Sequence, residues 1–296
     1  MKRGLHIGRC IIGVASLTAF AIAACSSFSE DAASGDDAGP DQVSPAADAG
    51  LDVSSSTDAA KASRYRDEVL ADGPIAYWRM GTKSGGVVVD ETDGGNPLSM
   101  IGTGATLGVP GAIPGDDDTA IHFAGSSRAR ATNPVPFHFP GNAPFTVELW
   151  AKRDRVDVGD TFQYMIDHAA GNGPNNRTGW ALYVTPKDGG SASSFETYRI
   201  DAGESGARGK LAPDAQWVHY VATLDPDTLT LTVYVDGAPE SPVAINAELA
   251  ATAADLLIGG QSGTSRQFPG AIDEVAIYAK VLPKLRIEAH LRAAGR

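Results

Sequence analysis

The sequence predicts an all-β, two-sheet antiparallel sandwich of the jelly-roll type for residues 63–296, with a short C-terminal helix. Short runs in which apolar and polar residues alternate with a period of two recur along this part of the chain. Clusters of Gly, Pro, Asn and Asp, which favour turns, separate these runs. Stretches with helical periodicity are scarce, so we expect one all-β domain.

The first 24 residues are typical of a signal peptide. A basic start precedes the apolar run 11–24, which is too short for a membrane-spanning helix of roughly 20 residues. The run leads into IAAC, which resembles the lipobox of bacterial lipoproteins. The resemblance implies cleavage before Cys25 and attachment of lipid to its thiol, whereas the alternative is an ordinary cleavage site beside an incidental cysteine. Ser26 is consistent with delivery to the outer membrane, so the expected location is the bacterial cell envelope.

The segment after Cys25, residues 25–62, is expected to be a disordered acidic linker. Ala, Ser, Asp, Gly and Pro dominate it, and residues 26–60 contain eight acidic residues but no Lys or Arg. Such a segment cannot bury enough apolar surface to offset the entropy cost of ordering.

Charge and cysteine content exclude several classes of function. The chain carries a net charge of −12, which argues against a nucleic-acid partner because phosphate binding requires clustered Lys and Arg. Cations and neutral glycans remain compatible with this charge. The only cysteine besides Cys25 is Cys10 in the leader, so the mature chain has no spare thiol for a disulfide or for thiolate chemistry.

Two elements can be assigned from local signals. WVHYVATLDPDTLTLTVYVDG, residues 217–237, predicts a hairpin whose strands join at 225–228, where Pro226 suits the first corner of a type I turn. LPKLRIEAHLRAA predicts the C-terminal helix, because Pro283 suits a helix start and compatible side chains recur four residues apart.

Several segments occur in a recognisable order: YRDEVLADGPIAYWRM, FTVELWAKR, LLIGG and FPGAIDEVAIYAKVLPKLRIEAH. Over about residues 65–293 this order resembles the laminin-G-like jelly-roll family of the concanavalin A-like lectin/glucanase superfamily. The resemblance implies two antiparallel sheets and, in many members, a calcium site near the rim of the sandwich. It also implies a binding or adhesion module whose partner is a glycan or a surface protein. Membrane attachment is expected only through the lipid on Cys25.

AIDEVAIY places Asp273 and Glu274 side by side in an otherwise apolar strand. Neighbouring side chains of a regular strand point to opposite faces, so Asp273 is expected on the face of Val275 and Ile277, and Glu274 on the other face. A glycosidase needs two carboxylates roughly 5–10 Å apart across a shared cleft. We therefore predict that these two acids are not a catalytic pair.

Asp273 has two interpretations, because a buried carboxylate needs either backbone donors or a cation. It either fastens a loop through backbone N–H groups or binds Ca²⁺, and the second interpretation draws on the resemblance. Asp118, in GDDDTAIHFAG, is the other candidate calcium ligand, although three successive aspartates are also typical of a solvated loop. Ala124 stands where the family often has the Asp of FDG, which removes one carboxylate. A chelator should lower the thermal midpoint if calcium is bound.

The motifs of hydrolases are incomplete. The glucanases of the superfamily carry E-x-D-x-x-E on one strand, but ETDGGN, residues 91–96, ends in Asn and lies among glycines. The histidines of the mature chain show neither H-x-x-x-H nor H-E-x-x-H spacing. We therefore predict a binding protein that is not an enzyme. The alternatives are a degenerate glycoside hydrolase and a passive structural protein of the envelope.

Candidate ligand-binding residues lie in two glycine-rich loops and the strand that follows the first. In HAAGNGPNNRTGWALYV, Asn176 and Arg177 offer planar hydrogen-bonding groups, and Trp180 or Tyr183 offers a stacking face. Arg266 in GGQSGTSRQFPG is a candidate of the same kind. The alternative is that the first loop is a connector and that Trp180 packs in the core.

Overall fold

The computed structural model describes residues 64–154, 161–171, 176–187, 190–199, 203–245, 248–263 and 266–296. All of them belong to the second of the two units into which the chain divides, Leu51–Arg296. The predicted signal peptide, Cys25 and the predicted linker over 25–62 lie outside the described residues. Among the helices that are described, none has the length and apolar character needed to cross a membrane.

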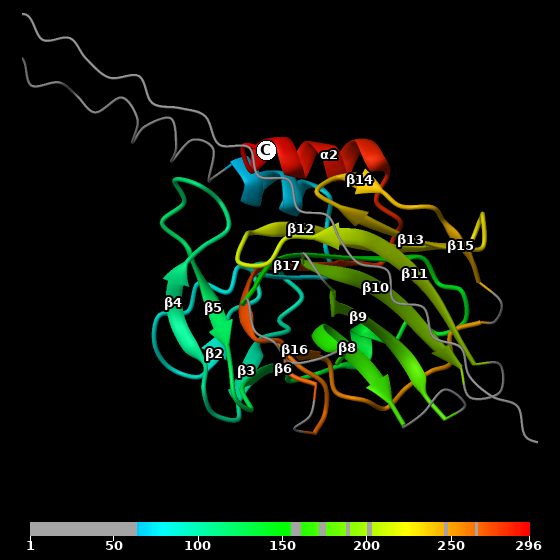
Figure 1. Cartoon of the computed structure of the whole chain (residues 1–296), viewed down its shortest axis with the longest axis horizontal. Helices are drawn as coiled ribbons and strands as arrows, with labels where there is room; N and C mark the ends of the chain where they lie inside the picture. Colours follow the sequence, from blue (N-terminus) through cyan, green and yellow to red (C-terminus); the bar gives the residue numbers. More distant parts are fainter. Residues whose placement is uncertain are drawn as a thin grey trace, which may run out of the picture. The chain divides into compact units, whose positions relative to one another are not determined.

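Two antiparallel sheets form the sandwich, which confirms the predicted fold class (Figure 1). The nine-stranded sheet has the order β14-β13-β12-β7-β17-β5-β4, with β1 also paired to β17 and β15 to β13. Its strands are β1 Ala76–Trp78, β4 Thr106–Pro110, β5 Thr119–Phe123, β7 Phe145–Arg153, β12 Val218–Asp225, β13 Thr230–Val235, β14 Ala238–Pro239, β15 Val243–Ala244 and β17 Gly270–Tyr278.

The eight-stranded sheet has the order β11-β10-β9-β8-β16-β6-β3-β2. Its strands are β2 Val87–Val88, β3 Leu98–Ile101, β6 Arg128–Ala131, β8 Gln163–Ala170, β9 Thr178–Lys187, β10 Gly190–Arg199, β11 Gly203–Ala212 and β16 Leu257–Ile258. A short 3₁₀ helix, η1 Val135–Phe137, precedes β7. The predicted hairpin is present as β12 and β13, with its turn at 226–229.

The main hydrophobic core lies between the two sheets. In β7, Phe145, Val147 and Leu149 belong to this core, whereas Trp150 belongs to a second apolar cluster on the outer side of the nine-stranded sheet. This alternation is the period-two pattern of the sequence expressed in space. Burial of these side chains contributes roughly 25 cal/mol per Å² of apolar surface removed from water.

Two helices cover the outer side of the nine-stranded sheet. The predicted helix is α2, Lys284–Ala293, and Pro283 occupies its N-cap (Figure 1). A second helix, over residues 64–71, was not predicted from the sequence. Tyr65 and Ile287 from the two helices pack in the outer cluster with Trp150 of the sheet.

A buried carboxylate on β7 joins these helices to the sheet. Glu148 accepts hydrogen bonds from the hydroxyls of Tyr65, at 3.2 Å, and Tyr278, at 2.9 Å. Its oxygens also lie 2.8 Å from Nε2 of His219 and 3.0 Å from Nδ1 of His290. Burial alone would raise the pKa of Glu148, but the charge of His290 and the hydrogen bonds from both histidines hold it well below its usual range.

Candidate functional sites

Strand β17 changes its partner on one edge midway along its length. Residues 270–272 pair with β5, residues 275–277 pair with β1, and β7 pairs with β17 along the other edge. The intervening residues 273–274 therefore lie where β5 begins and β1 ends. Asp118, which precedes β5, and Arg79, which follows β1, are brought to the same place.

A β-bulge at this point overturns the predicted placement of the two acids. Between the pairs Asp273–Trp150 and Ala276–Glu148, β17 contributes two residues and β7 only one. Glu274 has a φ of 51°, in the left-handed region. The prediction that Asp273 and Glu274 point to opposite faces was wrong, because the extra residue interrupts the alternation.

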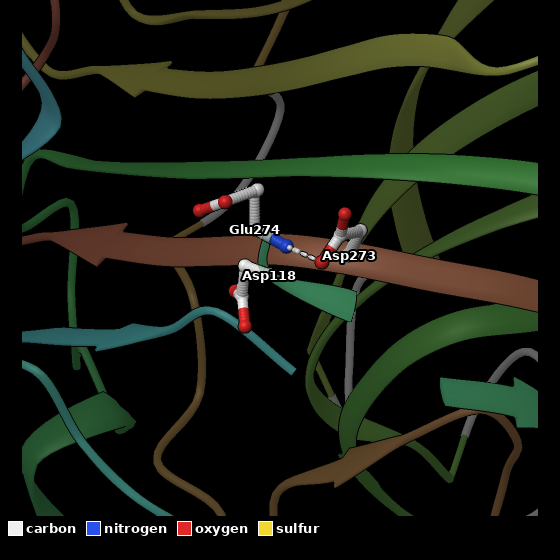
Figure 2. A group of neighbouring side chains, drawn as sticks. All are labelled: Asp118, Asp273 and Glu274. Carbon is white, nitrogen blue, oxygen red and sulfur yellow. Dashed lines mark hydrogen bonds between the residues drawn. The ribbon is translucent and has the colours of Figure 1, made fainter. Parts of the chain in front are cut away.

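Asp118, Asp273 and Glu274 form one acidic cluster (Figure 2). One carboxylate oxygen from each lies within 4.8 Å of the other two. The backbone N–H of Ala112 donates to Oδ2 of Asp273 at 2.7 Å, and the N–H of Glu274 donates to Oδ1 of Asp273 at 3.1 Å. The loop-fastening interaction, one of the two interpretations of Asp273, is therefore present.

Arg79 is the cation of this cluster. Its Nε and Nη2 donate to Oε1 of Glu274 at 3.2 and 3.1 Å, and Nε lies 3.3 Å from Oδ2 of Asp118. Nη2 also pairs with Asp116. The hydroxyl of Tyr77 donates to Oε2 of Glu274, so both oxygens of that carboxylate have donors.

Burial controls the electrostatics of the cluster. It raises the pKa of Glu274 to about 8, although Arg79 and the Tyr77 hydroxyl act in the opposite direction. Burial, followed by the nearby charge of Glu274, raises the pKa of Asp273 well above its usual range. Burial also raises the pKa of Asp118. All three acids therefore hold their protons more tightly than free carboxyl groups do.

The cluster is enclosed, which limits its chemistry. Asp273 and Glu274 are 2 % and 1 % exposed. A neighbouring pocket of about 230 Å³ is lined by Arg79 and Asp118 but by neither of these two acids. A glycosidase must bring both carboxyl groups to the scissile bond of a substrate. The two acids have no such access, although the reason is burial and not the opposite faces that the sequence suggested.

Asp118 and Asp273 are the predicted calcium ligands, and Glu274 lies with them. Carboxylate oxygens are the ligands that Ca²⁺ prefers, and their spacing suits Ca–O distances of about 2.3–2.6 Å. However, Arg79 already lies against Asp118 and Glu274, and both oxygens of Asp273 accept backbone hydrogen bonds. The residues as arranged do not fit a calcium ion, because both oxygens of Asp273 and of Glu274 already have donors and the Arg79 cation lies among the three acids.

A second cluster lies on the outer side of the eight-stranded sheet. We call Phe162, Tyr164, Arg177, Tyr183 and Arg266 the aromatic–arginine cluster. Tyr164 and Tyr183 belong to an apolar cluster separate from the core, with ring centroids 5.1 Å apart. Arg177 donates to the Tyr164 hydroxyl at 3.1 Å, and the guanidinium carbon of Arg266 lies 5.1 Å from the Phe162 ring. Cations over aromatic rings are a stabilising arrangement.

A buried carboxylate accompanies this second cluster. Asp167 is 1 % exposed and lies 3.6 Å from Nη2 of Arg177. Burial raises the pKa of Asp167 to about 7, although Arg177 and Arg266 act to lower it. Neither Asp167 nor Tyr164 was predicted from the sequence.

The structure brings together three of the five predicted ligand-binding residues. Arg177, Tyr183 and Arg266 belong to the aromatic–arginine cluster, and Asn176 is exposed beside it in sequence. Trp180 does not join them. It is fully buried in the main core, and its Nε1–H donates to the carbonyl of Phe137 at 2.9 Å.

Two charged residues, one in the acidic cluster and one beneath the helices, were missed although the sequence holds a weak signal for them. Arg79 is the only charged residue of IAYWRM, and Glu148 is the only acid of FTVELWAK. A lone charge in an apolar strand needs a buried partner. The partners themselves could not be identified, because they lie 195 and 142 positions away, at Glu274 and His290.

Comparison with solved structures shows the same fold in larger proteins. The binding domain of Paraclostridial Mosquitocidal Protein 1 matches with a TM-score of 0.57 and 16 % identity, over 75 % of this chain and 52 % of that one. The binding domain of Botulinum neurotoxin serotype D matches with a TM-score of 0.55 and 12 % identity, over 76 % and 52 %. That of Botulinum neurotoxin DC, solved in complex with SialylT, matches with a TM-score of 0.56 and 12 % identity, over 75 % and 52 %.

The chain therefore spans about half the length of these structures. No curated protein matches it. A family model described as the concanavalin A-like lectin/glucanases superfamily matches residues 123–288, which is more than half of the chain. Together with the two-sheet antiparallel sandwich, this match shows that the chain belongs to the concanavalin A-like lectin/glucanases superfamily.

Proposed function

We propose that the protein is a lipid-anchored protein of the bacterial cell envelope whose sandwich domain binds a glycan or a surface protein without catalysing a reaction. The observation that carries the proposal is the enclosure of Asp273 and Glu274. Both are buried and bonded within the protein. Paired carboxylates in this state are poor candidates for hydrolysis, so binding is the activity that the superfamily fold most simply provides.

The solved structures support a binding role in general terms. They are binding domains, and among them Botulinum neurotoxin DC has been solved both with SialylT and with rat synaptotagmin II. This chain matches about half of that binding domain, which has been solved with each of these two partners. We propose a partner of one of these two classes.

The aromatic–arginine cluster is the proposed binding face. Phe162 is 38 % exposed, and Arg266 packs on its ring and is only partly buried. An aromatic ring beside a guanidinium suits a sugar ring or a planar side chain of a partner. Arg266 also donates to the Tyr164 hydroxyl at 3.4 Å and acts on the buried carboxylate of Asp167, so its guanidinium is held at this face.

A glycan array and a pull-down of envelope proteins, combined with a reducing-sugar assay, test this proposal. Wild-type protein should bind a defined set of partners and release no sugar. Arg266→Ala should weaken binding roughly tenfold or more, since a hydrogen bond to a charged group contributes about 1.5–3 kcal/mol. Arg292→Ala is the matched control, because it removes an exposed arginine from α2 on the other sheet.

Each alternative function predicts a different result in these assays. Release of sugar would overturn the non-catalytic proposal in favour of a degenerate glycoside hydrolase. Absence of both binding and product would favour a passive structural protein. Binding that Arg266→Ala and Arg292→Ala reduce equally would remove the aromatic–arginine cluster as the binding face but leave the binding function intact.

The anchor is proposed from the leader alone. Cys25 follows an apolar run and two small residues, and lipidation at this thiol would place the sandwich at a membrane without a spanning segment. Residues 25–62 would then be the linker, and the sandwich domain would start at residue 63. Ser26 favours the outer membrane.

A further inference from the structure

We propose that Arg79 is the built-in counter-ion of the acidic cluster and takes the place of a metal ion, so that the stability of the domain does not depend on calcium. The calcium site that the family resemblance suggests was predicted at Asp118 and Asp273, two of these carboxylates. Arg79 already contacts Asp116, Asp118 and Glu274. One guanidinium thus bridges three acids, as a bound cation would.

Strand pairing holds Arg79 in this position. Tyr77 and Trp78 of β1 pair with Ala276 and Val275 of β17, so the next residue along β1 is directed toward Glu274. The bulge places the Glu274 carboxylate against that guanidinium. The side chain of Arg79 is 19 % exposed and leaves β1 beside its acceptors. Its position follows from the backbone and does not depend on a mobile loop.

Hydrogen-bond donors of the protein occupy all four carboxylate oxygens of the two buried acids, Asp273 and Glu274. Asp273 accepts the N–H groups of Ala112 and Glu274 on its two oxygens. Glu274 accepts Arg79 on one oxygen and Tyr77 on the other. A calcium ion, which takes six to eight oxygen ligands, would have to displace these donors and the guanidinium. The guanidinium fork also matches carboxylate geometry, which a point charge does not.

Thermal unfolding of wild-type protein in EDTA and in millimolar CaCl₂ tests the proposal. We expect the same midpoint, within about 1 °C, in both solutions. Arg79→Ala should lower the midpoint by roughly 10 °C, because removing one partner of a buried ion pair leaves uncompensated charge. Arg130→Ala is the matched control, since Arg130 is 47 % exposed and forms only a loose pair with Asp255; its midpoint should hardly change.

Arg79→Lys keeps the charge and provides a second variant if the alanine form does not fold. It should unfold at a temperature between those of wild type and Arg79→Ala, or fold where the alanine form does not. A wild-type midpoint that falls in EDTA and recovers with CaCl₂ would overturn the proposal. A midpoint for Arg79→Ala equal to that of Arg130→Ala would also overturn it. Since no partner is needed in these measurements, failure here leaves the proposed binding function untouched.

Discussion

Asp273 is a carboxylate that two backbone N–H groups hold inside the fold. Each N–H has this carboxylate as its acceptor, at 2.7 and 3.1 Å. The interaction connects β17 to residue 112, which is far away in the sequence. The residue therefore orders the loop before β5, whether or not its proton is bound.

Asp273→Ala should reduce the free energy of unfolding by about 1–3 kcal/mol, because two buried donors lose their acceptor. Asp273→Asn should lose less, since its side-chain oxygen can still accept one of them. Urea unfolding at constant ionic strength measures both values. Asp227→Ala, in the exposed hairpin turn, is the control and should be nearly neutral. Wild-type stability for Asp273→Ala would contradict the fastening role.

At the scale of single residues, the sequence predicted only part of the acidic cluster. The unusual position of Asp273 was evident from its apolar neighbours, but the shared placement with Glu274 was not. A bulge with its first residue in the left-handed region usually carries glycine there, and glutamate gives no such signal. Alternation is a reliable guide only where the pairing register is unbroken.

The helix over 64–71 and α2 depend on buried polar contacts as well as on apolar packing. Nε2 of His290 lies 2.9 Å from Asp72, and Arg286 donates to the same carboxylate at 2.8 Å. Burial alone would lower the pKa of His290, but the charge of Glu148 and its hydrogen bond raise it above the usual value. His290 is therefore more readily protonated in the folded protein than in the unfolded chain.

This shift predicts a loss of stability as pH rises. The contribution of His290 is complete below the unfolded pKa of about 6.5 and disappears as pH rises through the higher folded pKa. The free energy of unfolding should therefore decrease above about pH 6.5. His290→Gln should flatten this part of the profile and reduce stability at pH 6 by about 3 kcal/mol, since Glu148 would lose its buried partner.

Chemical unfolding of both proteins at several pH values between 5 and 9 makes this comparison. Other groups, including Glu274, also titrate in this range, so the difference between the two profiles is the relevant quantity. His122→Gln is the control, because that histidine is 29 % exposed and contacts neither helix. Parallel profiles for wild type and His290→Gln would refute the role of His290.

The two helices also show why local signals were sufficient for one element and not for the other. Pro283 and the residues four apart marked α2, whereas the segment 64–71 is too short to be helical without tertiary contacts. Tyr65 supplies such contacts by donating to Glu148 and accepting from the indole of Trp150. Neither partner is near it in the sequence.

For the whole molecule, the order of strand-like segments was sufficient to predict the sandwich and its family. Alternation and turn residues are distributed along the chain, so many weak signals agree. The proposed binding face was harder to predict from the sequence, because it depends on which strands pair and on which side of the sheet each residue lies. Trp180 illustrates this, because its place on β9 directs its side chain into the core. Tyr183, three residues further along the same strand, points outward.

The proposed anchor makes a prediction for the whole protein in its cell. Cys25→Ala should move the protein from the membrane fraction to the soluble fraction, because no thiol would remain for lipid attachment. Fractionation followed by immunoblotting measures this change. Cys10→Ala is the matched control and should stay with the membrane fraction, since that cysteine lies in the predicted leader. If Cys25→Ala also stays there, the lipid anchor is wrong.

The two ends of the described sandwich meet at one indole ring. Tyr65 lies 6.3 Å from the ring of Trp150, and the guanidinium of Arg296 lies 5.5 Å from it. One indole on the outer side of the nine-stranded sheet therefore holds both the helix over 64–71 and the chain beyond α2 against the sheet.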